Sequence, residues 1–331
     1  MNNIVYMFGA GASANSLPTI ATMPNRMEQM INLLKNNKGS LGLKNVQIPF
    51  FNRLLDDLQW LMTESKKHAT IDTFARKIFI TKGEYSNEYE KMKNTLSVYF
   101  ALEQANNKID YRYDTLLATI LNDDGKLPTN VKFLSWNYDI QMELAYLQYV
   151  IDEDLNNVKG HYLITYEKLV QSNKNNPKLL KLNGTAGIVE KSRNLPRYFD
   201  DKFTSLSQSL YKMLDEYGLL TNQKVSNLLS YSWENPENKD SYNEILKSYY
   251  DTHILVVIGY SFPFFNRNID KIILQAMIDG NLQKIYIQDM DNADNIKQRI
   301  IAVVGADVLN KRKLSINPIT DCENFYIPYE M

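Results

Sequence analysis

The sequence predicts an α/β fold, a Rossmann-like parallel sheet with large helical insertions, and three observations support this. Short apolar runs recur along the chain, and glycine or polar residues follow each of them. Helical patterns separate the runs, as in proteins whose strands alternate with helices in layers. The chain has 331 residues, which is enough for one large core. We therefore expect a single domain over residues 1–331.

The expected strands are short, apolar and bounded by turn-forming residues. Four runs are strongly apolar and a fifth is weaker. In chain order they are Ile4 to Phe8, Val131 to Ser135, the weaker Lys178 to Leu182, His253 to Ile258, and Lys284 to Gln288. Continuous runs of this kind are typical of strands buried on both faces of a parallel sheet.

Helical patterns fill the intervals between these strands. Met23 to Lys35 and Asn268 to Gly280 repeat apolar residues at helical spacing, and the second ends in a glycine that can cap a helix. Residues 45–125 contain further helical stretches, and residues 198–250 are rich in tyrosine and also favour helix. We interpret these two regions as helical insertions that cover the sheet.

Composition excludes several classes of site. The 37 basic and 38 acidic residues give a net charge of -1, which creates no general field for nucleic acid or anionic membrane. The single cysteine, Cys322, excludes an internal disulfide and a multi-cysteine zinc site. His68, His161 and His253 are scattered, which disfavours a histidine-built metal centre. We therefore expect no metal and no nucleic-acid binding.

The amino terminus and the hydropathy pattern predict a cytoplasmic location. The first apolar run has no positive charge before it, and two glycines interrupt it, unlike a secretory signal. No apolar stretch approaches the length of about 20 residues that spans a membrane. We expect no membrane association.

A glycine motif follows the first predicted strand directly. Residues 9–14 read "GAGASA" and match G-x-G-x-x-[G/A], in which one glycine makes a tight turn and the next lets backbone approach a pyrophosphate at a helix amino terminus. A plain strand-to-helix turn is the simpler alternative. A dehydrogenase would have an acidic residue at the end of a second strand about 20 positions on. Glu28 has that spacing but lies in a helical pattern, which disfavours a dehydrogenase.

Polar or glycine residues follow each of the other predicted strands. They are Asn137 and Asp139 in "SWNYD", Asn183-Gly184, Gly259-Tyr260-Ser261, and Asp289. Small and hydroxyl residues can bind phosphate through backbone N–H groups, and an aspartate can accept a hydrogen bond from ribose. Each segment alone can be a turn. Because ligands bind at the carboxyl ends of parallel strands, the five loops together predict a dinucleotide site.

The order of these motifs resembles a known family. The segments "GAGAS", "SWNYD", "KL-N-G" and "VIGYSFP" occur in the order found in the sirtuin-like family, and the resemblance is to its bacterial branch, whose members hydrolyse NAD in anti-phage defence. The helix expected at Ile71 to Phe79, "IDTFARKIF", also resembles that branch. The similarity extends from residue 4 to about residue 290.

The resemblance implies roles for individual residues. Gly9, Ala10, Gly11 and Ser13 would hold the pyrophosphate. Asn137 would position water near the nicotinamide ribose, and Asp139 would hold the loop or the ribose. Trp136 stands where the family has glutamine, which removes one expected ribose contact. The segment of residues 17–27, "LPTIATMPNRM", would form the loop over the nicotinamide end.

Two departures from the family disfavour protein deacylation. Asn183-Gly184 replaces a His-Gly pair whose histidine deprotonates a ribose hydroxyl, and an asparagine cannot do this. One cysteine also cannot build the zinc module of the deacylases. Hydrolysis of NAD demands less of the enzyme, because nicotinamide leaves as a neutral base and needs no acid to protonate it. The amides of Asn137 and Asn183 can stabilise the oxocarbenium-like ribose.

We therefore expect an NAD glycohydrolase that takes NAD as substrate and acts in anti-phage defence by NAD depletion, which is abortive infection. The motifs leave little sequence for a sensor, so we expect oligomerisation or a separate sensor subunit to gate the activity. A non-catalytic module that binds NAD or ADP-ribose is the main alternative, and Asn183 in place of histidine favours it. A dehydrogenase and a ligand-free scaffold rank lower.

Overall fold

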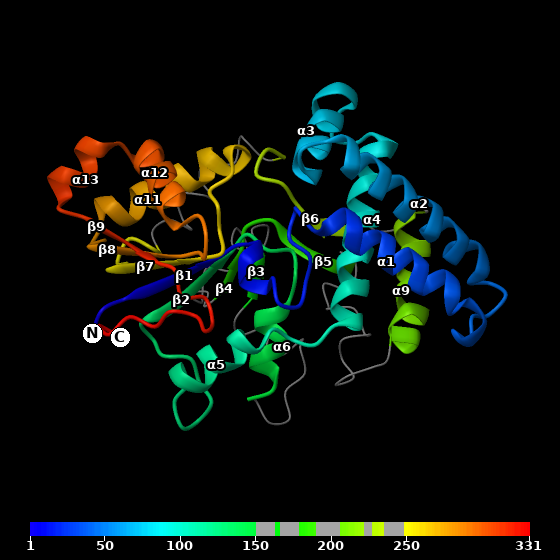
Figure 1. Ribbon diagram of the computed structural model, residues 1–331, viewed down its shortest axis with the longest axis horizontal. Coiled ribbons are helices and arrows are strands. Elements are labelled where there is room, and N and C mark those ends of the chain that lie inside the picture. The colour runs from blue at the N-terminus through cyan, green and yellow to red at the C-terminus, as the bar shows by residue number, and fades with distance from the viewer. Residues whose placement is uncertain (150–162, 166–178, 190–205, 222–226, 235–247) are drawn as a thin grey trace.

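The computed structural model describes residues 1–149, 163–165, 179–189, 206–221, 227–234 and 248–331. Its centre is a seven-stranded sheet with the order β3-β4-β2-β1-β7-β8-β9, in which every neighbouring pair is parallel. Helices flank this sheet (Figure 1). The predicted α/β fold with a Rossmann-like parallel sheet and helical insertions is confirmed.

The strands of the main sheet are short and mostly apolar. They are β1 (Ile4–Phe8), β2 (Val131–Ser135), β3 (Leu163–Thr165), β4 (Leu179–Lys181), β7 (Ile254–Ile258), β8 (Lys284–Gln288) and β9 (Ser315–Ile319). An antiparallel pair, β5 (Gly184–Val189) and β6 (Asn227–Leu229), forms a second small sheet. Three of the predicted strands, β1, β2 and β8, begin and end where the apolar runs do, and the predicted β4 and β7 differ by one residue at one or both ends.

The sequence did not predict the two outer strands of the main sheet. β9 reads "SINPI", with polar residues and Pro318 inside it. Proline is tolerated there because β9 lies at the edge of the sheet and pairs only with β8. β3, at the other edge, has three residues, too few to give a pattern.

The helices of the described ranges have these bounds: α1 (Met23–Asn36), α2 (Ile48–Lys67), α3 (Ile71–Lys82), α4 (Asn87–Asn106), α5 (Tyr111–Ile120), α6 (Gln141–Leu147), α9 (Leu206–Thr221), α11 (Arg267–Asp279), α12 (Ala293–Val304) and α13 (Ala306–Arg312). As predicted, Gly280 caps α11. A Cβ at that position would lie 1.9 Å from the carbonyl oxygen of Tyr250, so the cap requires glycine for space. In these ranges no helix is both long and apolar enough to cross a membrane.

Alternate residues of β1 enter different cores. Val5 and Met7 pack in a cluster with residues of α11 and α12. Tyr6 and Phe8 point to the opposite face and pack in a cluster that includes α5 and α6. Figure 1 shows these two helix layers on opposite sides of the sheet. Helices on both faces explain why the strands are apolar throughout.

The remaining helices α1, α2, α3, α4 and α9 form a helical lobe. Figure 1 shows the lobe gathered beyond the carboxyl ends of the strands, where it does not cover a face of the sheet. Of the predicted insertion at residues 45–125, only α5 covers a face, so the expectation that the insertions cover the sheet was largely wrong. In the described part of 198–250, α9 is helical as predicted, whereas β6 is a strand.

Candidate functional site

The site lies where the order of the sheet reverses. β1 is central, and its register places its last residue, Phe8, level with Ser135 of β2 and Ile258 of β7. The loops after these three strands therefore leave the sheet at one edge, which is where α/β proteins of this type bind ligands. The helical lobe stands opposite this edge (Figure 1).

A cleft between the strand ends and the lobe holds about 740 Å³ of space, including its open side. Its walls come from four sheet-end loops, from the segment before α1, and from α1, α3 and α4. The lining residues are Gly9, Ala10, Ser13, Leu17, Pro18, Ile20, Met23, Ile71, Asp72, Phe100, Trp136, Asn137, Tyr138, Asp139, Asn183, Gly259, Tyr260, Ser261, Pro263 and Asn266.

Most of the predicted site residues meet in this cleft. They are Gly9, Ala10, Ser13, Asn137, Asp139, Asn183, Gly259, Tyr260 and Ser261. The segment expected over the nicotinamide end contributes Leu17, Pro18, Ile20 and Met23. Gly11, Gly184 and Asp289 are not among the lining residues.

Gly11 brings two loops together and does not line the cleft. Its N–H donates to the carbonyl oxygen of Gly259 at 2.9 Å. A Cβ on Gly11 would lie 2.7 Å from the Cα of Gly259, and a Cβ on Gly259 would lie 2.4 Å from the carbonyl carbon of Gly11. Gly259 also has a φ of +59°, which favours glycine. Both glycines are therefore explained by the close contact of their backbones.

The glycine motif does not open a long helix. A four-residue 3-10 turn, Ala10–Ser13, follows the strand, and α1 begins only at Met23. The prediction of a pyrophosphate at the amino terminus of a helix after the motif was therefore wrong in its geometry. We call residues 9–13 the glycine loop.

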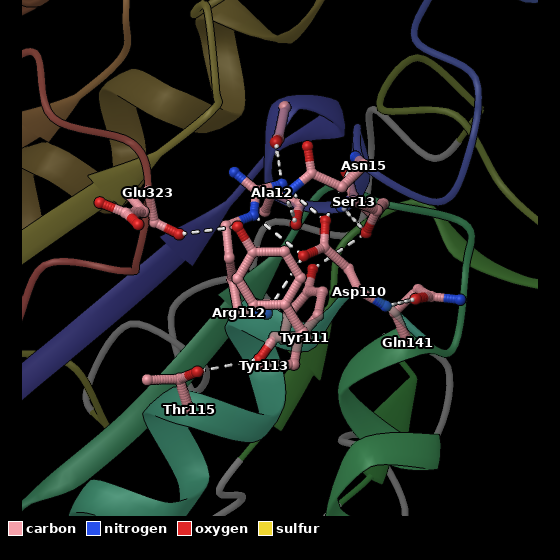
Figure 2. A network of polar contacts seen from close by, with 12 residues as sticks. Ala12, Ser13, Asn15, Asp110, Tyr111, Arg112, Tyr113, Thr115, Gln141 and Glu323 are labelled. Carbon is pink, nitrogen blue, oxygen red and sulfur yellow. Dashed lines mark hydrogen bonds and ion pairs between the residues drawn. The ribbon is translucent and has the colours of Figure 1, made fainter. Parts of the chain in front are cut away.

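The rear of the glycine loop is held by a buried ion pair (Figure 2). Arg112 Nη2 donates to the carbonyl oxygens of Gly11 and Ala12, both at 3.1 Å, and lies 2.6 Å from Asp110 Oδ2. The same Asp110 oxygen accepts the N–H of Asn15 at 3.2 Å. Sequence reasoning missed this pair, because charged residues at the start of a helix, such as Asp110 and Arg112, usually have only local contacts.

Ser13 and Asn137 join the glycine loop to the loop after β2. The hydroxyls of Ser13 and Tyr113 are 3.0 Å apart, and Ser13 is buried. Asn137 Nδ2 donates to the carbonyl oxygen of Gly9 at 2.9 Å and lies 3.5 Å from Ser13 Oγ. These contacts fix Asn137 directly beside the glycine loop.

Asp139 holds its own loop. Its Oδ1 accepts the N–H of Gln141 at 3.1 Å, at the start of α6. Its backbone carbonyl accepts a hydrogen bond from the buried Lys181, whose ammonium also lies 3.4 Å from Glu143. Burial raises the pKa of the Asp139 carboxyl, and the charge of Lys181 opposes that rise. Of the two roles expected for Asp139, the geometry favours the structural one.

Asn183 presents an acceptor that has no partner in the described part of the chain. Its Nδ2 donates to the carbonyl oxygen of Trp136 at 3.1 Å, and the residue is 6% exposed. Within the described ranges its Oδ1 is buried and accepts no hydrogen bond. A buried oxygen without a hydrogen-bond donor lowers the stability of the folded state by about 1–3 kcal/mol. The adjacent Gly184, with a φ of +70°, makes the turn into β5.

Trp136 and Tyr260 form an aromatic wall. Their rings stack with centroids 5.6 Å apart and planes 11° apart. The Tyr260 hydroxyl donates to Asp270 Oδ2 at 2.9 Å and accepts from Asn266 Nδ2 at 3.1 Å. Burial raises the pKa of the Asp270 carboxyl well above its ordinary value. The tryptophan after β2 is thus a packing surface of the cleft.

Several other polar residues singled out in the sequence lie elsewhere. Asp289 Oδ1 accepts the N–H groups of Asp291 and Asn292, so this residue forms a turn outside the cleft. His68 contacts Phe74 and the backbone of α2, and His253 accepts the N–H of Asn3. His161 lies outside the described residues.

Sequence reasoning also missed Asp72. This residue lies in the first turn of α3 and lines the cleft. The Tyr138 hydroxyl donates to its Oδ1 at 3.4 Å. Burial raises the pKa of the Asp72 carboxyl to about 6, and the hydrogen bond from Tyr138 opposes that rise. The pattern Thr70-Ile71-Asp72 marks the start of a helix, but nothing in the sequence places that start beside β2.

In the part of the chain that the structure describes, no group of three or more His, Cys, Asp or Glu side chains is arranged to hold a metal ion. The side chains that meet in the cleft are amides, aromatic rings, hydroxyls and carboxyls. Such groups suit an organic ligand with many hydrogen-bonding positions.

Comparison with known proteins assigns no family to the chain. No family model matches it. Among curated proteins, it is similar to the kinesin-like protein CIN8 of Eremothecium gossypii, with 21% identity over 285 residues. The match covers 83% of this chain but only 29% of that protein. Identity this low does not establish a family, and the sequence lacks the G-x-x-x-x-G-K-[S/T] pattern of a phosphate loop.

Proposed function

We propose that the chain is an NAD glycohydrolase that cleaves NAD into ADP-ribose and nicotinamide. One observation carries this proposal: Asn137 and Asn183, from two strand ends, meet in one cleft beside the glycine loop, and the Asn183 Oδ1 has no partner among the described residues. A ribose hydroxyl is the kind of donor that this oxygen lacks. The resemblance of the motifs to the sirtuin-like family supports the same substrate.

The cleft has suitable parts for a dinucleotide. The glycine loop and the Gly259-Tyr260-Ser261 loop lie side by side and offer backbone to a pyrophosphate. The apolar residues Leu17, Ile20 and Met23 line the same space and suit a flat ring. NAD contains all the groups that these walls favour.

The chemistry requires stabilisation of positive charge on the ribose. When the bond between C1′ and the nicotinamide nitrogen breaks, its electron pair goes to nicotinamide, which leaves neutral. Water then attacks C1′ and gives ADP-ribose and a proton. Fixed amide dipoles such as that of Asn137, held by Gly9, stabilise the developing charge without reorganisation.

We further propose that this activity serves anti-phage defence by depleting cytoplasmic NAD. Uncontrolled hydrolysis would kill the host cell, so we propose that self-association or a separate sensor subunit gates it. Rate measured against protein concentration tests this gating. Full specific activity in a dilute, monomeric sample would contradict it.

The second candidate is a non-catalytic module that binds NAD or ADP-ribose and signals through a partner. Asn183 favours it, because an amide at this position cannot take a proton from ribose. Release of nicotinamide distinguishes the two candidates. A binder would retain NAD unchanged, whether in purified form or in cell lysate.

The first experiment measures NAD consumption and nicotinamide release by the unmodified protein, Asn137→Ala and Asn295→Ala. Asn295 is exposed on α12 and serves as the control. We expect Asn137→Ala to reduce release at least about 10²-fold, as for loss of a group that stabilises developing charge. Asn295→Ala should retain the full rate. An unchanged rate in Asn137→Ala would remove Asn137 from the mechanism.

A further inference from the structure

Asp72 enters the cleft from the side opposite the amides. It lies in α3, which belongs to the helical lobe, whereas Asn137 and Asn183 follow strands of the main sheet (Figure 1). The helix is fixed at this end, because the Thr70 hydroxyl accepts the N–H of Thr73 at 3.0 Å. Ile71 and Phe100 line the cleft on the same side. The helix start that carries Asp72 is thus fixed beside the cleft, next to apolar lining residues.

The surroundings of Asp72 contain phenols and, within the described ranges, no neutralising cation. Tyr138 from the loop after β2, Tyr231 after β6 and Tyr260 after β7 all have pKa values raised by burial and by the charge of Asp72. Arg76, one turn along α3, places its guanidinium over the rings of Phe79 and Trp233. Within the described ranges, Asp72 forms no ion pair, and its only hydrogen bond is the one from Tyr138.

This distinguishes Asp72 from three buried acids that hold the fold. Asp110 has Arg112 at 2.6 Å, Glu103 has Arg26 at 2.6 Å, and Glu234 has Lys93 at 3.1 Å. A carboxyl that only stabilises a fold gains from such a partner, and one that lacks it costs stability. A cleft carboxyl without a cation is typical of a group kept for proton transfer.

The other groups of the cleft cannot take a proton as readily. Among the described residues that line the cleft, none is a histidine. The amides of Asn137 and Asn183 have no basic site in the useful pH range. Asp139 accepts the N–H of Gln141, and its backbone carbonyl accepts a hydrogen bond from the buried ammonium of Lys181, which places a cation near its carboxyl. Among the carboxyls that line the cleft, Asp72 is therefore the one that can accept a proton.

We propose that Asp72 is the general base for the water that attacks the ribose, an inference that rests on the proposed NAD hydrolysis. The C1′–nitrogen bond breaks with its electron pair on nicotinamide. The water oxygen then bonds to C1′ as one of its protons passes to the Asp72 carboxylate. The products are nicotinamide and ADP-ribose, and Asp72 returns the proton to solvent.

The test compares Asp72→Asn with Asp294→Asn in nicotinamide release and in NAD binding by calorimetry. Asp294 is also in the first turn of a helix, α12, but is exposed outside the cleft. We expect Asp72→Asn to lower kcat about 10²- to 10⁴-fold, which is the usual contribution of a general base. NAD affinity should change little. Asp294→Asn should behave like the unmodified protein.

The pH profile separates proton transfer from a structural role. A base must be deprotonated, so kcat should rise with pH through the pKa of Asp72, about 6. Asp72→Asn should lose this limb of the profile. Tyr138→Phe removes the hydrogen bond that lowers the pKa of Asp72, so the limb should move to higher pH.

Each outcome decides between the proposals. If the unmodified protein releases nicotinamide and Asp72→Asn keeps both rate and pH limb, the role of Asp72 is overturned and NAD hydrolysis stands. If the unmodified protein binds NAD but releases none at any protein concentration, whether purified or in cell lysate, hydrolysis is overturned and the role of Asp72 with it. An unchanged limb in Tyr138→Phe would contradict Asp72 as its source.

Discussion

The two sides of the glycine loop differ in how fully their polar groups are paired. On the rear side, Arg112 donates to Asp110 and to two backbone carbonyls, and Asp110 also accepts a backbone N–H (Figure 2). On the cleft side, Asn183 Oδ1 has no partner within the described ranges, and Asp72 has one hydrogen bond of 3.4 Å. Both sides are built from comparable residue types.

The difference separates scaffold from site. Buried polar groups in folded proteins are nearly always hydrogen-bonded, so the paired rear side follows the general rule. Unpaired groups lower stability and persist where a ligand or a reaction needs them. The rear network should therefore matter for stability, and the cleft groups for binding and turnover.

The largest change in stability is expected on the rear side of the glycine loop. Arg112→Ala leaves Asp110 buried without its cation, so the free energy of unfolding should fall by about 3–5 kcal/mol. The measurement is urea-induced unfolding followed by circular dichroism. Arg312→Ala is the control, because Arg312 and Asp279 are 4.0 Å apart and half-exposed, and it should cost less than about 1 kcal/mol. Equal losses would remove the distinction between this pair and a surface pair.

Replacement of Asp72 is expected to change stability less than replacement of Arg112, and in the opposite direction. Its pKa is about 6 in the folded protein and near its ordinary 3.8 when unfolded, so the folded state binds more protons between these values. The contribution of Asp72 to stability is therefore largest below pH 4 and falls as the pH rises through 6. Asp72→Asn lacks this loss and should be more stable by roughly 1–3 kcal/mol at pH 7. Unfolding at pH 4 and pH 7 measures it.

The gain in Asp72→Asn should disappear at pH 4, where the carboxyl of the unmodified protein is protonated. A variant that is more stable and less active would mark Asp72 as a functional group. If Asp72→Asn were instead less stable at pH 7, the carboxylate would belong with the paired groups of the rear side.

The smallest change in stability is expected at Asn183. Asn183→Ala loses the hydrogen bond to the Trp136 carbonyl but also removes a buried acceptor without a partner, so the two effects oppose each other. Unfolding free energy should change by less than about 1 kcal/mol. NAD affinity, measured by calorimetry, should fall about tenfold, which equals about 1.4 kcal/mol. Normal affinity with a large loss of stability would assign Asn183 to the scaffold.

The sequence predicted the central strands well and the edges of the sheet poorly. β1, β2 and β8 are continuous apolar runs, and their bounds were correct. β9 contains Pro318 and polar residues, because an edge strand is paired on one side only. The position of the helical lobe was also wrong, since amphipathic patterns show which face of a helix is buried but not what buries it.

The candidate site was predicted where its residues directly follow strands. Asn137, Asn183 and Tyr260 were found in this way, and all three line the cleft. Asp289 also follows a strand, but β8 is separated from the cleft by β7, and its carboxyl forms a turn. The spacing of residues along the chain does not show how far each strand lies from the position where the order of the sheet reverses.

By itself, the sequence determined the alternation of strands and helices and the residues at the strand ends, because apolar runs and turn residues act over a few positions. Only the tertiary structure decided that Gly11 packs against Gly259, that Arg112 supports the glycine loop, and that Asp72 faces the cleft. These contacts join residues roughly 65 to 250 positions apart. They depend on how whole layers pack, which no local pattern specifies.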